Sequence, residues 1–303
     1  MALFIGIDIG GTKIAGGLVT REGRLSRRSE RPTPPGGGLA ILETAIEVAQ
    51  EVASSEGITG VGIGTGGQVD ADRGVVVSAT EILPKWAGTD VKTGFESALN
   101  VPAAVENDVN ALAVGEARFG AARGLSTVVF LALGTGVGGA LLLNGHVHHG
   151  AHWVGGEFGH ILLSADPNAR KASDGAVGSL EAYCSGPGLV QTWREMTGSR
   201  DETVTGHTIG DWASQDPSSF AAQAVRKTGE YLGYGLVTLT NALDPDRIVI
   251  GGGLASLGDL LLGPARAVLA VRALPGPASC PVVTATLGAD ASLIGAAALI
   301  MPR

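Results

Sequence analysis

The sequence predicts an α/β fold in two domains, and three observations support this prediction. Short apolar segments with the character of buried strands alternate with longer segments of helical periodicity. A length of 303 residues is long for one hydrophobic core and favours two packed domains with a cleft between them. Two glycine-rich hairpins of the same design lie far apart in the chain, as expected for two related domains.

The first predicted elements are a strand hairpin and a helix. Leu3 to Ile9 (LFIGIDI) is continuously apolar and β-branched, and Gly10-Gly11 separates it from a second apolar stretch, Ile14 to Val19. This pattern predicts a hairpin with a glycine tip. Further along, apolar residues from Leu42 to Ala53 recur at the spacing of an amphipathic helix, which Gly57 can terminate. Later strands are predicted at Gly60 to Gly64, Val101 to Val105 and Thr127 to Leu133.

The second glycine hairpin spans Val128 to Leu143. Its sequence VVFLALGTGVGGALLL repeats the design of the opening FIGIDIGGTKIAGGLV: an apolar strand, a glycine tip with a threonine, and a returning strand. The alternative explanation is that glycine-rich hairpins are simply common. A third glycine run, IVIGGGLA from Ile248 to Ala255, follows another apolar strand.

The two glycine tips are candidate phosphate sites, because glycine lets a ligand approach the backbone N–H groups closely. They are Gly10-Gly11-Thr12-Lys13 and Gly134-Thr135-Gly136. Neither has the spacing of a P-loop or of a dinucleotide-binding motif, so a different phosphate-binding architecture is expected. Asp8 could hold Mg²⁺ through water, with a turn acid as the alternative. Lys13 could contact phosphate, with a solvated hairpin lysine as the alternative.

A candidate catalytic carboxylate lies where an apolar strand ends and an alanine-rich helix begins, at Glu106-Asn107-Asp108. Catalytic groups often lie at strand ends of α/β sheets. A hydroxyl that accepts a phosphoryl group needs a positioned carboxylate to take its proton, and Asp108 is the candidate for this role. The alternative is that Asp108 is the N-cap of the helix, for which aspartate is a preferred residue.

A second polar group occurs in VGGEFGH, where Glu157 and His160 are three residues apart and could bind a polyol together. Four histidines precede them and are expected to be solvated rather than to bind a metal. These four are His146, His148, His149 and His152.

Composition argues against several classes of protein. The chain has 29 acidic and 21 basic residues, and its only basic cluster is the short RLSRR stretch, so a nucleic-acid partner is not expected. No apolar run approaches the roughly 20 residues that cross a bilayer, and no basic leader is apparent, which favours a cytoplasmic location without membrane insertion. The two cysteines, Cys184 and Cys280, predict buried thiols and no disulfide framework.

The motifs together resemble those of the ROK sugar kinases, the bacterial glucokinase-like group within the actin/hexokinase ATPase superfamily. The resemblance covers essentially the whole chain. It rests on DIGGTK (Asp8 to Lys13), END (Glu106 to Asp108), LGTGVGGALLLNG (Leu133 to Gly145), GEFGH (Gly156 to His160), SLEAY (Ser179 to Tyr183) and IVIGGG (Ile248 to Gly253).

The resemblance implies a two-domain actin-like ATPase (ribonuclease H-like) fold with an interdomain cleft. The smaller domain would comprise residues 1–109, completed by a C-terminal helix at 291–303, and the larger one residues 110–290. It implies an ATP-dependent kinase that uses Mg²⁺ and acts on the 6-hydroxyl of a hexose, in a homodimer or homotetramer. The phosphates of ATP would lie at Gly10, Gly11, Thr12, Lys13, Gly134, Thr135 and Gly136, the adenosine near Gly252 and Gly253, Mg²⁺ near Asp8, and the sugar at Asn107, Asp108, Glu157, His160 and Glu181.

The sequence departs from the family pattern at three places. KASDGAVGSLEAY stands where members commonly carry a cysteine-rich zinc segment, so no structural zinc is expected, and His160 would need another partner to fix its ring. GTGGQVD has a glycine where proline is usual. SATEILPKW places Glu81 near a position where glucose kinases usually have asparagine, which favours an aminohexose such as kanosamine or glucosamine as substrate; a surface glutamate is the alternative.

Other functions make different predictions. A kinase for N-acetylmannosamine or fructose would keep the same motifs. A sugar-responsive transcriptional regulator of the family would carry a helix-turn-helix domain, and the segment before Asp8 has no room for one. An actin-like ATPase acting on proteins would hydrolyse ATP without sugar.

Overall fold

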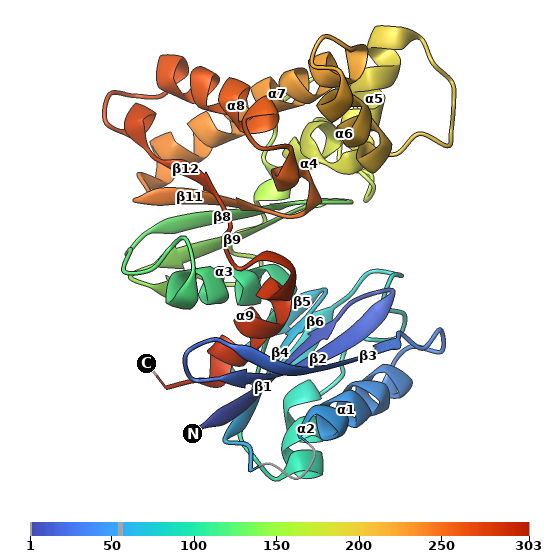
Figure 1. Cartoon of the computed structure of the whole chain (residues 1–303), viewed down its shortest axis with the longest axis vertical. Helices are drawn as coiled ribbons and strands as arrows, with labels where there is room; N and C mark the ends of the chain where they lie inside the picture. The colour runs from blue at the N-terminus through green and yellow to red at the C-terminus, as the bar shows by residue number, and fades with distance from the viewer. Residues whose placement is uncertain (1, 54–56, 303) are drawn as a thin grey trace. The chain divides into compact units, whose positions relative to one another are not determined.

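The computed structural model describes residues 2–53 and 57–302, which divide into two compact units. The first unit comprises Met1–Gly124, His146–Gly155 and Thr286–Arg303, and the second comprises Leu125–Gly145 and Gly156–Ala285. Each is built around a mixed sheet with helices packed on it (Figure 1). The boundary expected at residue 109 falls inside helix α3 (Asp108–Phe119), and the first unit continues past the end of that helix.

The sheet of the first unit has the strand order β3-β2-β1-β4-β7. Strands β1 and β2 form the predicted antiparallel hairpin with the glycine tip between them, and β1, β4 and β7 run parallel. A separate pair of strands, β5 and β6, follows β4. The bounds are β1 (Leu3–Ile9), β2 (Lys13–Thr20), β3 (Leu25–Pro32), β4 (Gly60–Thr65), β5 (Gln68–Asp70), β6 (Val75–Ser78) and β7 (Ala103–Asn107).

Helices cover both faces of this sheet (Figure 1). Helix α1 (Leu39–Ala53), with α2 (Val91–Leu99) beside it, packs on one face, and α9 (Ala291–Ile300) packs on the other face next to α3. The predicted helix at residues 42–53 is therefore confirmed as part of α1. The residues between Ala53 and Gly57, where that helix was expected to stop, lie outside the described part of the chain.

Two glycines explain how closely α9 approaches the sheet. A Cβ atom at Gly6 would lie 1.9 Å from the carbonyl oxygen of Leu293, and one at Gly62 would lie 1.8 Å from that of Ala296. Both distances are far below van der Waals contact, so the helix backbone occupies the space that any side chain would need. Part of the high glycine content thus serves helix–sheet packing and not ligand binding.

The strands of the second unit lie in the order β9-β8-β11-β12, with β8 and β9 antiparallel and β8, β11 and β12 parallel. The predicted second glycine hairpin is confirmed as β8 (Val128–Leu133) and β9 (Val137–Leu143). The other strands of this unit are β11 (Arg247–Gly251) and β12 (Val282–Thr284), whereas β10 (His146–Val147) belongs to the residues of the first unit.

The helices of the second unit gather on one face of its sheet (Figure 1). They are α4 (Leu180–Cys184), α5 (Gly186–Thr197), α6 (Gly206–Gln215), α7 (Phe220–Leu243) and α8 (Asp259–Arg272), with short 3-10 turns at η1 (Phe158–His160), η2 (Gly253–Leu257) and η3 (Pro277–Ser279); a further turn, η4 (Gly288–Asp290), precedes α9 in the first unit. Among the described helices, none is both long and apolar enough to cross a membrane.

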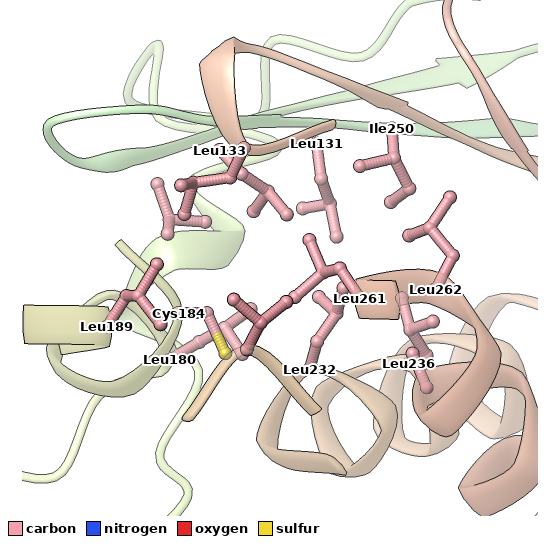
Figure 2. Close-up of a cluster of buried hydrophobic side chains, with 14 of the residues drawn as sticks. Leu131, Leu133, Leu180, Cys184, Leu189, Leu232, Leu236, Ile250, Leu261 and Leu262 are labelled. Atoms are coloured by element: carbon pink, nitrogen blue, oxygen red, sulfur yellow. The ribbon is translucent and has the colours of Figure 1, made fainter. Parts of the chain in front are cut away.

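The core of the second unit forms where these helices meet the sheet (Figure 2). Leu131 and Ile250 point from β8 and β11 toward Leu232 of α7 and Leu261 of α8. Cys184 lies in the same cluster, and its burial raises the pKa of the thiol, so it is a buried, unreactive group. Cys280 is only partly buried.

Candidate active site

The junction between β7 and α3 holds the candidate catalytic carboxylate, as predicted. The N-cap of α3 is Asn107, whose Oδ1 accepts the N–H groups of Val109 (2.9 Å) and Asn110 (3.2 Å). The alternative that Asp108 is the cap is therefore wrong by one residue. Asn107 has the extended ψ of 145° that a cap requires, whereas Asp108 is already the first helical residue.

Asp108 occupies the first turn of α3, where the exposed N–H groups of a helix favour a negative charge. Its Oδ1 accepts the N–H of Val109 at 2.9 Å, and the residue is half-buried. The side chain of Asn107 is held from the other side as well, because its amide donates to the carbonyl of Gly67 at 3.0 Å. The hydrogen bonds of Asn107 to Gly67 and to the first turn of α3 thus fix the backbone that carries the Asp108 carboxylate.

Glu106, which was not predicted as a site residue, stabilises this junction by hydrogen bonds to its backbone and side chains. Its side chain is 6% exposed, and its Oε1 accepts the N–H of Asn107 (2.9 Å) and the side-chain amide of Asn110 (3.1 Å). Its Oε2 lies 2.6 Å from Nε2 of His149. The hydrogen bond with Glu106 raises the pKa of His149, against the opposing effect of burial.

The expectation that the four histidines are solvated is therefore wrong for one of them. His146, His148 and His152 are exposed, but His149 is half-buried because it pairs with Glu106. No periodicity could reveal this pair, since His149 lies in an irregular loop far from Glu106 in sequence. Within the described residues there is no group of three or more histidine, cysteine, aspartate or glutamate side chains placed to hold a metal.

The segment GTGGQVD, which carries glycine where the family pattern has proline, joins β4 to β5. The N–H of Gly66 points to the carbonyl of Ile9 (3.4 Å), a bond that proline could not make. Just before it, the hydroxyl of Thr65 accepts the indole N–H of the buried Trp86 at 2.9 Å. These bonds fix the loop whose Gly67 carbonyl receives the Asn107 amide.

The first glycine tip lies between β1 and β2, with Gly11, Thr12 and Lys13 exposed. The N–H of Gly10 donates to the carbonyl of Lys13 at 3.0 Å, which closes the turn. The ammonium of Lys13 lies 3.3 Å from the exposed carboxylate of Glu30. This contact fits the alternative of a solvated hairpin lysine.

Asp8 lies at the end of β1, next to this tip. Burial raises the pKa of its carboxyl, while a hydrogen bond from Ser292 and the charges of Lys13 and Arg28 act in the opposite direction. Asp8 is only partly buried, so its carboxylate can be reached by a hydrated cation. One carboxylate also matches Mg²⁺, which is usually held by one or two carboxylates together with substrate phosphates and water.

The second glycine tip contacts one of the predicted sugar ligands directly. The carboxylate of Glu181, in α4, accepts the N–H of Val137 through Oε2 at 2.9 Å. A Cβ atom on Gly136 would lie 2.6 Å from the same oxygen, so a side chain there would displace the carboxylate from this position. The N–H of Gly186, which begins α5, donates to the carbonyl of Gly134 at 2.8 Å.

Three of the predicted sugar ligands come together in the second unit. Burial raises the pKa of Glu157, the charge of His160 opposes this effect, and the charge of Glu181 adds to it, so both side chains lie near Glu157. His160 also has the additional partner that the sequence analysis left open: its Nε2 lies 3.6 Å from Oδ2 of Asp174. Asp174 belongs to the KASDGAVGS segment.

A cavity of about 1060 Å³ lies in the second unit beside the second glycine tip. Gly134 and Thr135 of the tip and Gly253 of the third glycine run line its wall. Gly252 does not line it; its φ is 82°, and a Cβ there would meet the backbone of Leu133 at 2.4 Å, so this glycine serves the turn. The cavity is large enough for a nucleotide, which fits the ATP prediction.

Glu81 lies in an exposed turn of the first unit, after β6. In that unit the structure brings Asn107 and Asp108 together at one helix end, and places Asp8 at the first tip. In the second unit it brings together Glu157, His160 and Glu181.

Comparison with known proteins shows similarity over most or all of the chain. The ROK family model matches residues 4–303. A glucokinase of Streptomyces coelicolor is 34% identical over 317 aligned positions, covering 99% of this chain and 98% of the relative. An N-acetyl-D-glucosamine kinase of Salmonella typhimurium is 31% identical, covering 84% of this chain and 85% of the relative.

Among solved structures, a ROK family glucokinase from Streptomyces griseus in complex with glucose and AMPPNP superposes with a TM-score of 0.82 at 33% identity, covering 98% of both chains. The match of the family model over nearly the whole sequence and these full-length similarities lead to one conclusion. The chain belongs to the ROK family.

Proposed function

We propose that this protein is an ATP-dependent hexose kinase that phosphorylates the 6-hydroxyl of glucose or a glucose-like aminohexose, with Asp108 as the general base. The observation that carries the proposal is the β7–α3 junction, where Asn107 caps the helix and leaves the carboxylate of Asp108 in the first turn. Similarity to a glucokinase over 99% of the chain supports the kinase class.

The chemistry of Asp108 follows from its place. A hydroxyl is a weak nucleophile, and a carboxylate within hydrogen-bond reach takes its proton as the oxygen attacks the γ-phosphorus of ATP. The N–H groups at the start of α3 favour a negative charge on Asp108, and the charged carboxylate is the form that accepts the proton. The other residues of the site would position the sugar and ATP and stabilise the charge on the transferred phosphoryl group.

The sugar is proposed to bind Asn107, Glu157, His160 and Glu181 besides Asp108. Carboxylates accept hydrogen bonds from sugar hydroxyls, and an imidazole or amide can donate to their oxygens. The amide of Asn107 uses one hydrogen for Gly67 and has a second for the sugar. Glu157 is exposed at the start of η1, where a ligand can reach its carboxylate.

The nucleotide is proposed to occupy the cavity of the second unit, with its phosphates at the two glycine tips, Gly10 to Lys13 and Gly134 to Gly136. Gly253 lines the same cavity and fits the adenosine end. Asp8 would hold Mg²⁺ through water. When bound, Mg²⁺ would neutralise charge that develops on the phosphate oxygens.

The first experiment compares Asp108→Asn with the parent enzyme in a coupled assay of ADP release. The amide keeps the size of the carboxylate but cannot take the proton, so kcat should fall by about 100- to 10,000-fold while sugar binding, measured by calorimetry, is largely kept. Asp90→Asn is the matched control, because Asp90 caps α2 and asparagine is an equally good cap. Near-normal turnover of Asp108→Asn would refute the role of the base.

The second experiment identifies the sugar with a panel of glucose, glucosamine, kanosamine, N-acetylglucosamine, N-acetylmannosamine and fructose. Glu81 is exposed and free to reach an ammonium group, which supports an aminohexose. Under this proposal Glu81→Gln lowers kcat/KM for the aminohexose and leaves that for glucose unchanged. If the parent and Glu81→Gln prefer the same sugar to the same degree, Glu81 is a surface residue that does not contact the sugar.

The same assays discriminate the alternatives. Sugar binding without turnover, together with binding to DNA fragments, would indicate a regulator. ADP release that does not depend on sugar would indicate an ATPase that acts on protein partners. We also propose a cytoplasmic homodimer or homotetramer, and light scattering after gel filtration measures the oligomeric state.

A further inference from the structure

Residues 170–178 form a small hairpin before α4, called here the 170–178 hairpin. Lys171 pairs with Val177 in an antiparallel bridge, and the N–H of Ala172 donates to the carbonyl of Ala176 at 2.8 Å. The turn is closed by Gly175, whose N–H donates to the carbonyl of Ala172 at 3.0 Å and whose φ is 90°. The segment is therefore an ordered structure with its own hydrogen bonds.

The base of the hairpin is anchored by the guanidinium of Arg170, whose side chain is 11% exposed. It pairs with the carboxylate of Glu195 in α5, its Nε donating at 3.1 Å, and its Nη1 donates to the hydroxyl of Thr192 at 2.9 Å. The guanidinium also lies over the rings of Tyr183 and Tyr231, at 4.8 and 5.4 Å from their centres. A planar, forked cation of this kind holds several partners in fixed directions.

The tip of the hairpin contacts two of the proposed sugar ligands. The hydroxyl of Ser173 donates to Oε1 of Glu181 at 2.8 Å, and Oδ2 of Asp174 lies 3.6 Å from Nε2 of His160. The other oxygen of Asp174 accepts the N–H of Ala176 at 2.9 Å, which fixes its side chain. Because the N–H of Val137 binds the second oxygen of Glu181, that carboxylate is held at both oxygens.

The hairpin also forms part of the wall of the cavity proposed for the nucleotide, through Arg170, Lys171, Ala172 and Ser173. One short segment of the second unit thus contacts both proposed ligand sites. We propose that the 170–178 hairpin, anchored by Arg170, sets the direction of the Glu181 carboxylate for the sugar, and that Ser173 and Arg170 are positioning residues. This inference rests on the hexose kinase function proposed above.

The expected kinetic effect is on sugar binding more than on turnover. Glu181 would bind the sugar in the ground state and in the transition state alike, and losing such uniform binding raises KM without a matching fall in kcat. A hydrogen bond to a charged group contributes enough to change an equilibrium by about tenfold when it is lost. Ser173→Ala should therefore raise KM for the sugar by about tenfold and change kcat by less than about threefold.

The test compares four variants in steady-state kinetics with sugar and ATP varied separately. Ser173→Ala should show the rise in sugar KM, and Ser173→Thr, which keeps the hydroxyl, should restore the parent value. Arg170→Met should raise the sugar KM at least as much as Ser173→Ala. Arg266→Met is the matched control, because Arg266 also binds a carboxylate and a carbonyl, those of Asp259 and Val282, but does not line the cavity.

Several results would overturn the inference. An unchanged sugar KM in Ser173→Ala would do so, as would an equal rise in the KM of ATP, which would indicate a loosened cavity wall. If Arg266→Met raises the sugar KM as much as Arg170→Met does, both arginines act through the general stability of the protein and not through Glu181. If Arg170→Met does not fold, the Ser173 pair still decides.

Hydrogen–deuterium exchange separates this inference from the proposed function, because it needs no activity. The Val137 amide should exchange faster in Ser173→Ala than in Ser173→Thr, since the freed carboxylate of Glu181 accepts its bond less steadily. Equal exchange in the two variants would contradict the positioning role. If the parent protein phosphorylates no sugar of the panel, the proposed function is wrong. The exchange comparison of Ser173→Ala with Ser173→Thr still tests whether Ser173 holds the Glu181 carboxylate.

Discussion

Replacing His149 with alanine removes one of three groups that hold the buried carboxylate of Glu106. The imidazole lies 2.6 Å from Oε2, while Asn107 and Asn110 donate to Oε1. Removing one partner of a buried ion pair costs about 3–5 kcal/mol when no other donor remains. Here two donors remain and the imidazole is 28% exposed, so we expect the free energy of unfolding to fall by about 1.5–3 kcal/mol.

The pH dependence of this loss follows from the raised pKa of His149. The hydrogen bond with Glu106 is the main cause, burial acts against it, and the charges of Glu106, Asp72 and Asp70 add to it. A pKa that is higher in the folded state than in the unfolded state, where it is about 6.5, means that the charged imidazole stabilises the fold. Its contribution is complete below the unfolded value and is lost as the pH rises through the folded value.

The assay is calorimetry of His149→Ala and of the parent at several pH values, with His152→Ala as control because His152 is an exposed residue of the same loop. The variant should unfold on the order of 5 °C lower at pH 6, and the difference should shrink as the pH is raised. An equal shift for His152→Ala, or a difference that grows with pH, would refute the assigned ion pair.

Two further predictions concern close approaches by glycine. Gly62→Ala should destabilise the first unit by about 1–3 kcal/mol or more, because its Cβ would lie 1.8 Å from a carbonyl of α9; denaturant titration measures this, and Gly36→Ala, whose Cβ meets no described atom within 4 Å, should be nearly neutral. Gly136→Ala should displace the Glu181 carboxylate and raise the sugar KM, whereas Gly134→Ala, with open space at its Cβ, should affect the KM of ATP alone. Equal sugar KM values for the two tip variants would show that Glu181 does not bind the sugar.

Much of the fold was predictable because its strands are buried on both faces. Leu3 to Ile9 and Val128 to Leu133 read as continuous apolar runs, and the glycines between strands mark the turns. The END motif was found because it lies where the apolar strand β7 ends and α3 begins. What failed by one residue was the helix cap, because asparagine and aspartate are equally good caps and only backbone geometry distinguishes Asn107 from Asp108.

The supporting contacts of the site could not be predicted, because they join segments that no periodic pattern relates. His149 reaches Glu106 from an irregular loop, and Ser173 and Asp174 reach Glu181 and His160 from a turn that looks like a polar linker in the sequence. Such contacts depend on tertiary structure. The sequence pattern predicted which groups could face a ligand, and only the structure shows which side chains contact those groups.

The position of α9 has a consequence for how the chain is made. This helix packs on β1 and β4, so the sheet of the first unit lacks this cover until residues 291–300 have been synthesised. The second unit, by contrast, is nearly continuous in sequence and has all its strands by residue 285. The sheet of the first unit can therefore complete its packing on this face only after the residues of the second unit have been synthesised.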